Sequence, residues 1–323
     1  GVAVTTGINN TIIGGLAGDA LTTGTDNVAI GYNALTSAQE DTRNTAIGRG
    51  TLATQNGAGT AYNTAVGYHA GASVTTGEYN TFIGGLAGDA ITTGGYNTAL
   101  GYLALSAANS NEQYNVAIGS GSLMNLDGSG DMWNTAVGTN SGLNITTGTY
   151  NVLLGGRAGD ALTAGSRNIA IGFDALGSED DHLGNIAIGY SALKTQDAGT
   201  NAYNIAVGYD AGKNVTTGVG NTLIGAFAGD NLTIGFENVA IGKNALGEDV
   251  DGAENIAIGR SAMSSTTNAR ASVAIGYNAL QNLNYGSLTY THNIGIGFTA
   301  GALITSGVQN TIIGGLAGDA LTT

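Results

Sequence analysis

The sequence predicts an all-β fold, a parallel β-solenoid of about 18 coils with about 17 residues each. A five-residue unit recurs eighteen times: Asn, then Thr, Val or Ile, then any residue, an aliphatic residue and Gly. The intervals between copies are mostly 17 residues, with others of 18, 19 and 21, so only the connecting segments change length. Loops tolerate such insertions and packed strands do not. The unit alternates as a strand does, and the chain shows no helical period.

Asn opens seventeen of the eighteen copies, and Ser272 opens the remaining one. In a stack of similar coils these side chains fall in one row, and stacked amides hydrogen-bond along the axis. We therefore expect a structural Asn ladder. Its members are Asn10, Asn27, Asn44, Asn63, Asn80, Asn97, Asn115, Asn134, Asn151, Asn168, Asn185, Asn204, Asn221, Asn238, Asn255, Asn293 and Asn310.

Alternation within the unit places the second and fourth residues on one face of a strand, and Asn and the third residue on the other. The fourth residue is aliphatic in every copy, and the second is always β-branched, as suits a strand beside a core. We therefore expect the fourth residues to form the buried row. They are Ile13, Ile30, Ile47, Val66, Ile83, Leu100, Ile118, Val137, Leu154, Ile171, Ile188, Val207, Ile224, Ile241, Ile258, Ile275, Ile296 and Ile313.

The rest of each coil predicts turns and further strands. Gly closes every unit, which permits a sharp corner or a close backbone approach that other residues resist. Two short apolar clusters follow, for example Ala17 and then Leu21. Each coil is therefore expected to hold two or three short strands, paired in parallel with their copies in neighbouring coils.

A second period lies above the coil. The units that begin at Asn10, Asn80, Asn151, Asn221 and Asn310 continue in a similar way, at spacings of 70, 71, 70 and 89 residues. Four coil types thus cycle in order, with one extra coil near Ser272. Residues 1–9 align with 71–79, and residues 10–23 recur identically as 310–323. We expect one continuous array over 1–323, cut from a longer one, because solenoid ends normally carry caps.

Composition disfavours several functions. Cys and Pro are absent, and the net charge of −14 repels phosphate backbones and anionic lipid headgroups. We expect no nucleic-acid partner, and no membrane insertion because no apolar stretch is long enough. The three histidines His69, His182 and His292 are scattered, and no nucleophile or P-loop motif is present. The chain is therefore not expected to be an enzyme, and it predicts no catalytic residue and no cofactor.

The "GGLAGDAL" segment is similar to the calcium-binding glycine-aspartate repeat of β-roll toxins, whose carboxylates lie on successive turns. Here the Asp recurs only every fourth coil, roughly 19 Å apart at the usual strand spacing, which is too far to share an ion. A turn-stabilising role is expected instead, and calcium binding is unsupported. The five residues are Asp19, Asp89, Asp160, Asp230 and Asp319.

Three further features bear on binding. Thr-Thr-Gly segments at 22–24, 75–77, 92–94, 146–148 and 216–218 raise an ice-binding hypothesis, although only two coil types carry them. The segments "GSEDDHL" at 177–183 and "GEDVDGAE" at 247–254 predict acidic surface loops in which receptor specificity could vary.

The arrangement of the aromatic residues favours a ladder or interchain packing over stacking on a glycan. They form two rows: Tyr32, Tyr68, Tyr102, Phe173, Tyr190, Tyr209, Tyr277 and Phe298, and Tyr62, Tyr79, Tyr96, Tyr114, Trp133, Tyr150 and Tyr203.

The segments "NTAIGRGTL", "NTAVGYHAG", "NVAIGYNAL" and "SVAIGYNAL" resemble the head repeats of trimeric autotransporter adhesins (YadA-like). They are also similar to the "NTAVGYxAG" arrays of phage tail fibres and bacterial surface fibre proteins. The resemblance covers essentially the whole chain, although the coils are longer and these 323 residues show neither the neck nor the membrane anchor of that family. It implies a left-handed parallel β-roll, three chains wound about one axis, and use as a stalk or adhesive fibre.

We therefore expect a structural extracellular fibre segment, located on a cell surface or a virion surface. The apolar side chains are mostly small, which favours a core shared by several chains and hence a homotrimer, with end-to-end filaments as a further form of self-association. A receptor- or glycan-binding adhesin module and an ice-binding β-solenoid are the alternatives. The sequence leaves the receptor or glycan unknown.

Overall fold

The computed structural model describes residues 4–57, 59–107 and 111–322. It is all-β, with no helix in these ranges, and folds as a parallel β-solenoid of about 18 coils, as predicted. The chain divides into two compact units, Gly1–Gly165 and Ser166–Thr323, which are described separately. Residues 1–3 of the stretch that aligns with 71–79, and Thr323 at the end of the identical repeat, lie outside the described residues. One continuous array over 1–323 stays a prediction.

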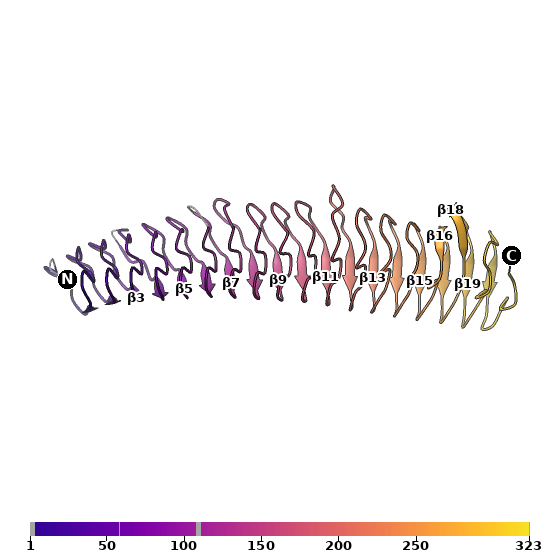
Figure 1. The fold of residues 1–323 in the computed structure, drawn as a ribbon, viewed down its shortest axis with the longest axis horizontal. Coiled ribbons are helices and arrows are strands. Elements are labelled where there is room, and N and C mark those ends of the chain that lie inside the picture. The colour runs from indigo at the N-terminus through magenta and orange to yellow at the C-terminus, as the bar shows by residue number, and fades with distance from the viewer. Residues whose placement is uncertain (1–3, 58, 108–110, 323) are drawn as a thin grey trace. The chain divides into compact units, whose positions relative to one another are not determined.

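The described part of the first unit holds a single row of three-residue strands (Figure 1). Each pairs in parallel with the next, in a register that aligns equivalent residues of successive coils: Ala29 lies opposite Ala46, and Ile30 opposite Ile47. The strands are β1 (Thr11–Ile13), β2 (Val28–Ile30), β3 (Thr45–Ile47), β4 (Thr64–Val66), β5 (Thr81–Ile83), β6 (Thr98–Leu100), β7 (Val116–Ile118), β8 (Thr135–Val137) and β9 (Val152–Leu154).

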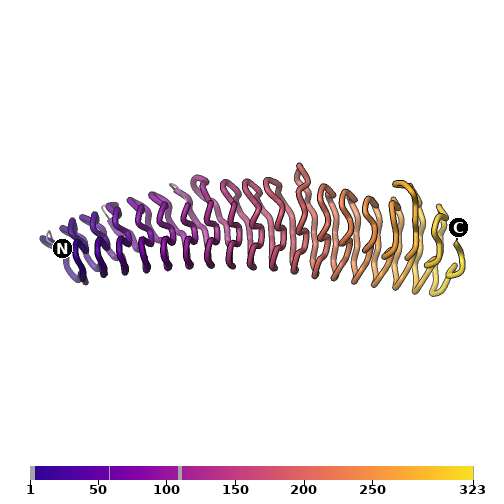
Figure 2. The backbone as a smooth tube through the Cα atoms, viewed as in Figure 1, coloured from indigo at the N-terminus to yellow at the C-terminus, as the bar shows by residue number. Residues whose placement is uncertain are grey.

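The second unit repeats this arrangement, and its coils follow similar backbone paths (Figure 2). Its main row consists of β10 (Ile169–Ile171), β11 (Ile186–Ile188), β12 (Ile205–Val207), β13 (Thr222–Ile224), β14 (Val239–Ile241), β15 (Ile256–Ile258), β17 (Val273–Ile275), β19 (Ile294–Ile296) and β20 (Thr311–Ile313). A second, two-stranded parallel sheet joins β16 (Thr267–Arg270) to β18 (Asn284–Tyr290). No helix able to cross a membrane is found in the described part of the chain.

Most coils contain one strand, where the sequence predicted two or three. The residues after the strand adopt left-handed backbone angles, with φ of 60° at Asn33 and 52° at Leu35, so the apolar clusters form turns. The closing Gly has a φ of 130° at Gly31. A Cβ there would lie 2.5 Å from the carbonyl oxygen of Gly48 in the next coil. Gly is therefore required where the stacked coils turn the corner.

The predicted buried row is wrong for the single chain. The fourth residues of the units lie on the outer face of the strands and are partly or largely exposed, for example Ile47 at 37% and Leu100 at 42%. The third residues, such as Ala29 and Ala46, form the core row and are fully buried. The correction applies to Ile13, Ile30, Ile47, Val66, Ile83, Leu100, Ile118, Val137, Leu154, Ile171, Ile188, Val207, Ile224, Ile241, Ile258, Ile275, Ile296 and Ile313.

The Asn side chains explain why the faces are reversed. Each Asn points into the coil, where it hydrogen-bonds to buried backbone, for example Asn27 to the carbonyl of Asp41 at 2.8 Å. Since strand side chains alternate, an inward Asn places the third residue inside and the second and fourth outside. The buried Asn therefore determines which strand face points inward, and the larger aliphatic side chains of the fourth residues lie on the outer face.

In the core, the four-coil cycle matches the size of the third residue of a unit to the size of the residues packed against it. Every cycle places one large third residue, such as Phe82, where most other coils carry Ala. A Cβ at Gly88 of the same coil would lie 2.5 Å from the Phe82 ring, and one at Gly71 of the preceding coil 2.9 Å from it. In the coil with Ala29 at the third position, the buried Leu35 stands where the coil of Phe82 has Gly88. Close packing thus links each large residue to two glycines.

This pattern predicts coupling between Phe82 and Gly88. Phe82→Ala should lower the free energy of unfolding by about 3–5 kcal/mol through the cavity it leaves. Gly88→Leu should also destabilise, since its side chain overlaps the Phe82 ring. The double variant reproduces the pairing of Ala29 with Leu35. Its loss in free energy of unfolding should be smaller than the sum of the two single-variant losses by at least about 1 kcal/mol. Urea unfolding of the parent, the two single variants and the double variant measures these free energies. If the two single-variant losses simply add in the double variant, the two residues are not matched in volume.

Candidate functional site

The Asn row joins neighbouring coils within each unit and closes the coils that are 17 residues long. The backbone N–H of Asn238 donates to Asn221 Oδ1 at 3.0 Å, and Asn238 Oδ1 accepts the N–H of Asn255 at 3.1 Å. Asn238 Nδ2 donates to the carbonyl of Gly252, fourteen residues further along, at 2.7 Å. Similar bonds recur in both units, and Ser272 Oγ accepts the N–H of Asn293 at 3.2 Å. These amides are engaged with the protein, so their arrangement supports a structural role rather than ligand binding.

Loss of one amide should therefore be costly. Asn238→Ala leaves the N–H of Asn255 and the carbonyl of Gly252 buried without partners, and should lower the free energy of unfolding by at least about 2 kcal/mol. Asn231→Ala is the matched control: Asn231 also donates to a carbonyl, that of Gly247, but is exposed. Its loss should cost less than about 1 kcal/mol. Chemical unfolding measures both losses. If Asn231→Ala lowers the free energy of unfolding as much as Asn238→Ala does, the Asn row has no special role in stability.

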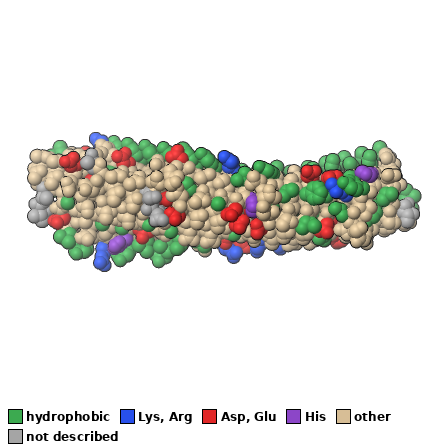
Figure 3. Space-filling view, turned by 90° about the horizontal axis from the view of Figure 1, so that it is seen from above, with side chains coloured by type: hydrophobic (Ala, Val, Ile, Leu, Met, Phe, Trp, Pro, Cys, Tyr) green, Lys and Arg blue, Asp and Glu red, His purple; other side chains and the backbone are tan. Residues whose placement is uncertain are grey.

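The outer strand face carries no charged residue: the fourth residues of the units are all aliphatic, and the second residues are Val, Ile or Thr. Its rows consist of the second and fourth residues of the units, and beside them lies the first aromatic row. In the second unit the rings of Tyr190 and Tyr209 stack with centroids 5.2 Å apart. In the first, Arg49 occupies the aromatic position and lies 5.9 Å from the ring centroids of both Tyr32 and Tyr68. The face in Figure 3 consists mostly of backbone and uncharged polar side chains, with hydrophobic side chains gathered mainly along its long edges and acidic side chains scattered over it.

Five of the seven residues of the second aromatic row form a ladder of stacked rings. Centroid separations along Tyr62, Tyr79, Tyr96, Tyr114 and Trp133 are 5.5, 4.8, 5.0 and 4.1 Å, and neighbouring planes lie within 19° of parallel. The faces of the inner rings are therefore covered by other rings, and their edges point outward. Stacking of a sugar on an aromatic residue needs a free ring face. The geometry favours the ladder in this row over glycan stacking.

The Thr-Thr-Gly rows also bond internally. The hydroxyls of Thr22, Thr75, Thr146 and Thr216 donate to carbonyls of the next coil at 3.1–3.2 Å. An ice-binding surface needs a flat array of groups free to order water, and these hydroxyl protons are already used. The first Thr of these segments therefore supports the stack, and ice binding stays an alternative from the sequence.

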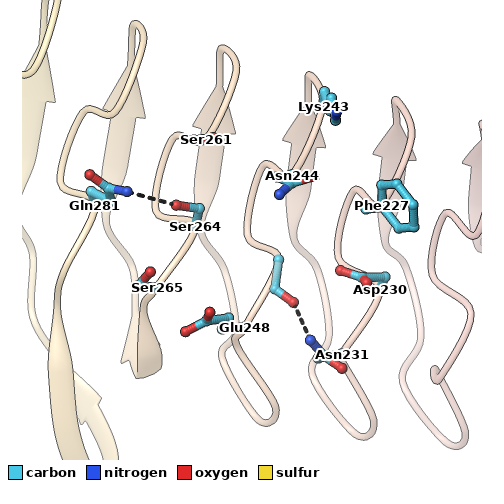
Figure 4. A pocket seen from close by; sticks show the side chains of 11 residues that line it. Phe227, Asp230, Asn231, Lys243, Asn244, Glu248, Ser261, Ser264, Ser265 and Gln281 are labelled. Carbon is cyan, nitrogen blue, oxygen red and sulfur yellow. Dashed lines mark hydrogen bonds between the residues drawn. The ribbon is translucent and has the colours of Figure 1, made fainter.

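The five Asp residues of the "GGLAGDAL" coil type lie in separate coils, as the sequence indicated. Burial raises the pKa of Asp89, and it raises that of Asp230 to about 6. Asp230 borders an open hollow of about 540 Å³ in the second unit (Figure 4). Carboxylate, amide and hydroxyl groups dominate its lining, where Gln281 Nε2 donates to Ser264 Oγ at 3.3 Å. The hollow offers polar contacts but no catalytic pairing.

Sequence reasoning missed a set of buried carboxylates. Asp41, Glu112, Glu179 and Asp249 are fully buried, and each belongs to the second coil type of its cycle. Asp249 Oδ1 accepts the N–H groups of Gly252 and Asn268 at 2.9 and 3.0 Å, and burial raises its pKa to about 7. The segments 177–183 and 247–254 are thus not wholly the surface loops that were expected. The available signal was position: Glu179 stands where the coil of Asn27 has the buried Ala38.

Carboxyl groups with a raised pKa should make the folded chain more stable in acid than at neutral pH. Burial raises the pKa of Asp249 to about 7, that of Asp230 to about 6, and that of Glu179 as well. The folded chain therefore binds more protons than the unfolded chain between about pH 4 and 7. The contribution of these groups to the free energy of unfolding is fully present below about pH 4, and it is lost as the pH rises through about 7.

The test is the melting temperature followed by circular dichroism from acid to neutral pH. It should fall as the pH rises, and Asp249→Asn should flatten the decline. A melting temperature that rises over this range, or an unchanged slope in the variant, would contradict the assignment.

A scan of the chain against protein-family models and a search of curated proteins both find no match. The resemblance to surface-fibre repeats thus stays an expectation from the residues. What the chain does must be inferred from its fold and its surfaces.

Proposed function

We propose that this chain is a segment of an extracellular structural fibre, on a cell or virion surface, whose copies associate through the outer strand face. The observation that carries the proposal is the composition of that face. In all eighteen units the second and fourth residues are uncharged, and the fourth is always aliphatic. The same side chains are partly or largely exposed in the single chain.

A contiguous exposed apolar surface is unusual in a monomer and marks an interaction site. A second copy of the chain fits this face because its strands recur at the same spacing, so that aliphatic rows lie against aliphatic rows. Three such faces around one axis give the left-handed homotrimer that the repeat resemblance implies. The fourth residues would then form a core between chains rather than within one.

The proposed role is mechanical. Within each unit, neighbouring coils are bonded through backbone pairs of the strands and through the Asn side chains. Such a stack suits a rigid spacer that holds another part of a protein away from a surface. The net charge of −14 argues against nucleic acid or anionic lipid as the partner. In the adhesin alternative, the polar hollow near Asp230 is where a receptor glycan would find hydrogen-bonding groups.

The proposal predicts a trimer in solution, measured by analytical ultracentrifugation. Ile171→Lys combined with Ile188→Lys puts two charges on the outer face of β10 and β11, and should give a monomer with unchanged circular dichroism. Thr200→Lys, at an exposed turn position, is the matched control and should remain trimeric. A monomeric parent chain, or a trimer that tolerates both lysines, would overturn association through this face.

A further inference from the structure

Four metal-ligating side chains meet in the second unit, away from the strand face and the hollow. Glu179, Asp180 and His182 precede β11, and Asp197 belongs to the following coil. Each presents one oxygen or imidazole nitrogen, and these four donor atoms lie within 4.8 Å of one another. We propose that this cluster binds one divalent transition-metal ion, with Zn²⁺ the best match, and that the ion joins two neighbouring coils.

The separations suit a small cation. His182 Nδ1 lies 2.7 Å from Glu179 Oε1 and 3.8 Å from Asp180 Oδ1. In a tetrahedral site with metal–ligand bonds of about 2.0–2.1 Å, donor atoms lie about 3.3–3.4 Å apart. These two distances bracket this value, and the other donor pairs of the cluster lie within 4.8 Å of one another. The mixed nitrogen and oxygen donor set suits Zn²⁺, whereas Ca²⁺ takes oxygen ligands.

Burial gives the cluster an inner wall and an open side. The side chain of Glu179 is fully buried, that of His182 nearly so, and that of Asp180 is half-exposed. Placing a carboxylate inside a coil costs free energy unless a positive group compensates it. Asp197 adds a further negative charge near Glu179. A divalent cation would offset these carboxylates together, and the exposed Asp180 and Asp197 leave it a path of entry.

The Asn row holds the ligands in place. Asn168 Nδ2 donates to the backbone carbonyl of His182 at 2.9 Å, and Asn168 Oδ1 accepts the N–H of Asn185 at 2.9 Å. Asn185 Nδ2 in turn lies 3.4 Å from Glu179 Oε2. Two ladder residues thus fix the backbone of one ligand and the carboxyl group of another. Such supporting hydrogen bonds orient metal ligands before the ion arrives.

Two related coils show that the combination is specific to this position. In the coil of Asn238, Asp249 stands in place of Glu179, and Gly252 in place of His182. In the coil of Asn27, Ala38 and Asp41 stand at these positions. Neither coil combines a buried carboxylate with an imidazole there. The architecture alone therefore does not require the pair, and an Ala at the first position is compatible with the fold.

A metal-free ion pair between His182 and Glu179 is the competing explanation, and the two differ in their response to metal. The experiment uses the 323-residue chain, stripped with a chelator that is then removed, and titrated with ZnCl₂ by calorimetry near neutral pH. The metal site predicts saturable binding of one Zn²⁺ per chain and a higher melting temperature. His182→Gln and Asp197→Asn should each weaken the affinity by at least about tenfold, since even outer-shell partners change it by about 10- to 100-fold.

Two variants separate ligand loss from misfolding. His69→Gln removes a histidine outside the cluster and should bind Zn²⁺ as the parent does. Glu179→Ala installs the residue found at Ala38, which the fold accommodates, so the variant should still unfold cooperatively without metal, while Zn²⁺ binding is lost. The proposal is overturned if the parent shows no saturable binding. It is equally overturned if Glu179→Ala or His182→Gln binds as tightly as the parent, or if Ca²⁺ binds as tightly as Zn²⁺.

Discussion

One hydrogen-bonding arrangement, made by the Asn at the start of each coil, constrains the rest of the structure. Its Oδ1 accepts the N–H of the next Asn, and in the 17-residue coils its Nδ2 donates to a carbonyl later in the same coil, as Asn221 does with Asn238 and Gly235. These groups are buried, and leaving any of them unpaired costs about 1–3 kcal/mol. The chain must therefore return to the same point at every turn. In the 17-residue coils the closing bond reaches the carbonyl fourteen residues after the Asn, whereas in the 19-residue coils Asn44 Nδ2 has no partner among the described residues and Asn115 and Asn185 donate elsewhere. The 19-residue coils therefore occur where this closing bond is not made, while the bond from Oδ1 to the N–H of the next Asn is kept.

The strand faces, corners and core follow from the inward Asn. The third residue shares its face and must be small, or else be matched by glycines as Phe82 is by Gly71 and Gly88. The closing Gly is needed because a Cβ at Gly31 would meet the carbonyl of Gly48. The second and fourth residues are turned outward, where their aliphatic side chains have no core to enter within the chain. The same constraint thus builds the scaffold and produces the surface through which copies are proposed to associate.

The repeat made the fold class predictable, and the aliphatic fourth residue made the wrong face look buried. Alternation divides a strand into two faces but does not say which one points inward, and Ile30 is more hydrophobic than Ala29. The better signal was the pairing of Ala29 with Leu35 and of Phe82 with Gly88, since only packed side chains need complementary volumes. Glu179 and Asp249 were read as surface residues because acidic side chains usually are. The cluster of Glu179, His182 and Asp197 spans a coil boundary, so no short motif could reveal it.

The proposed roles rest on this scaffold, since both the outer face and the metal-ligating cluster are positioned by the Asn row. Native-state hydrogen exchange at the backbone N–H of Asn238, which donates to a side chain rather than to a strand partner, tests that row most directly. If the Asn bonds hold the coils together, this N–H will exchange as slowly as that of Val239, which pairs with the carbonyl of Asn255 within the sheet. Exchange as fast as at the exposed turn residue Thr200 would contradict the central role of the row.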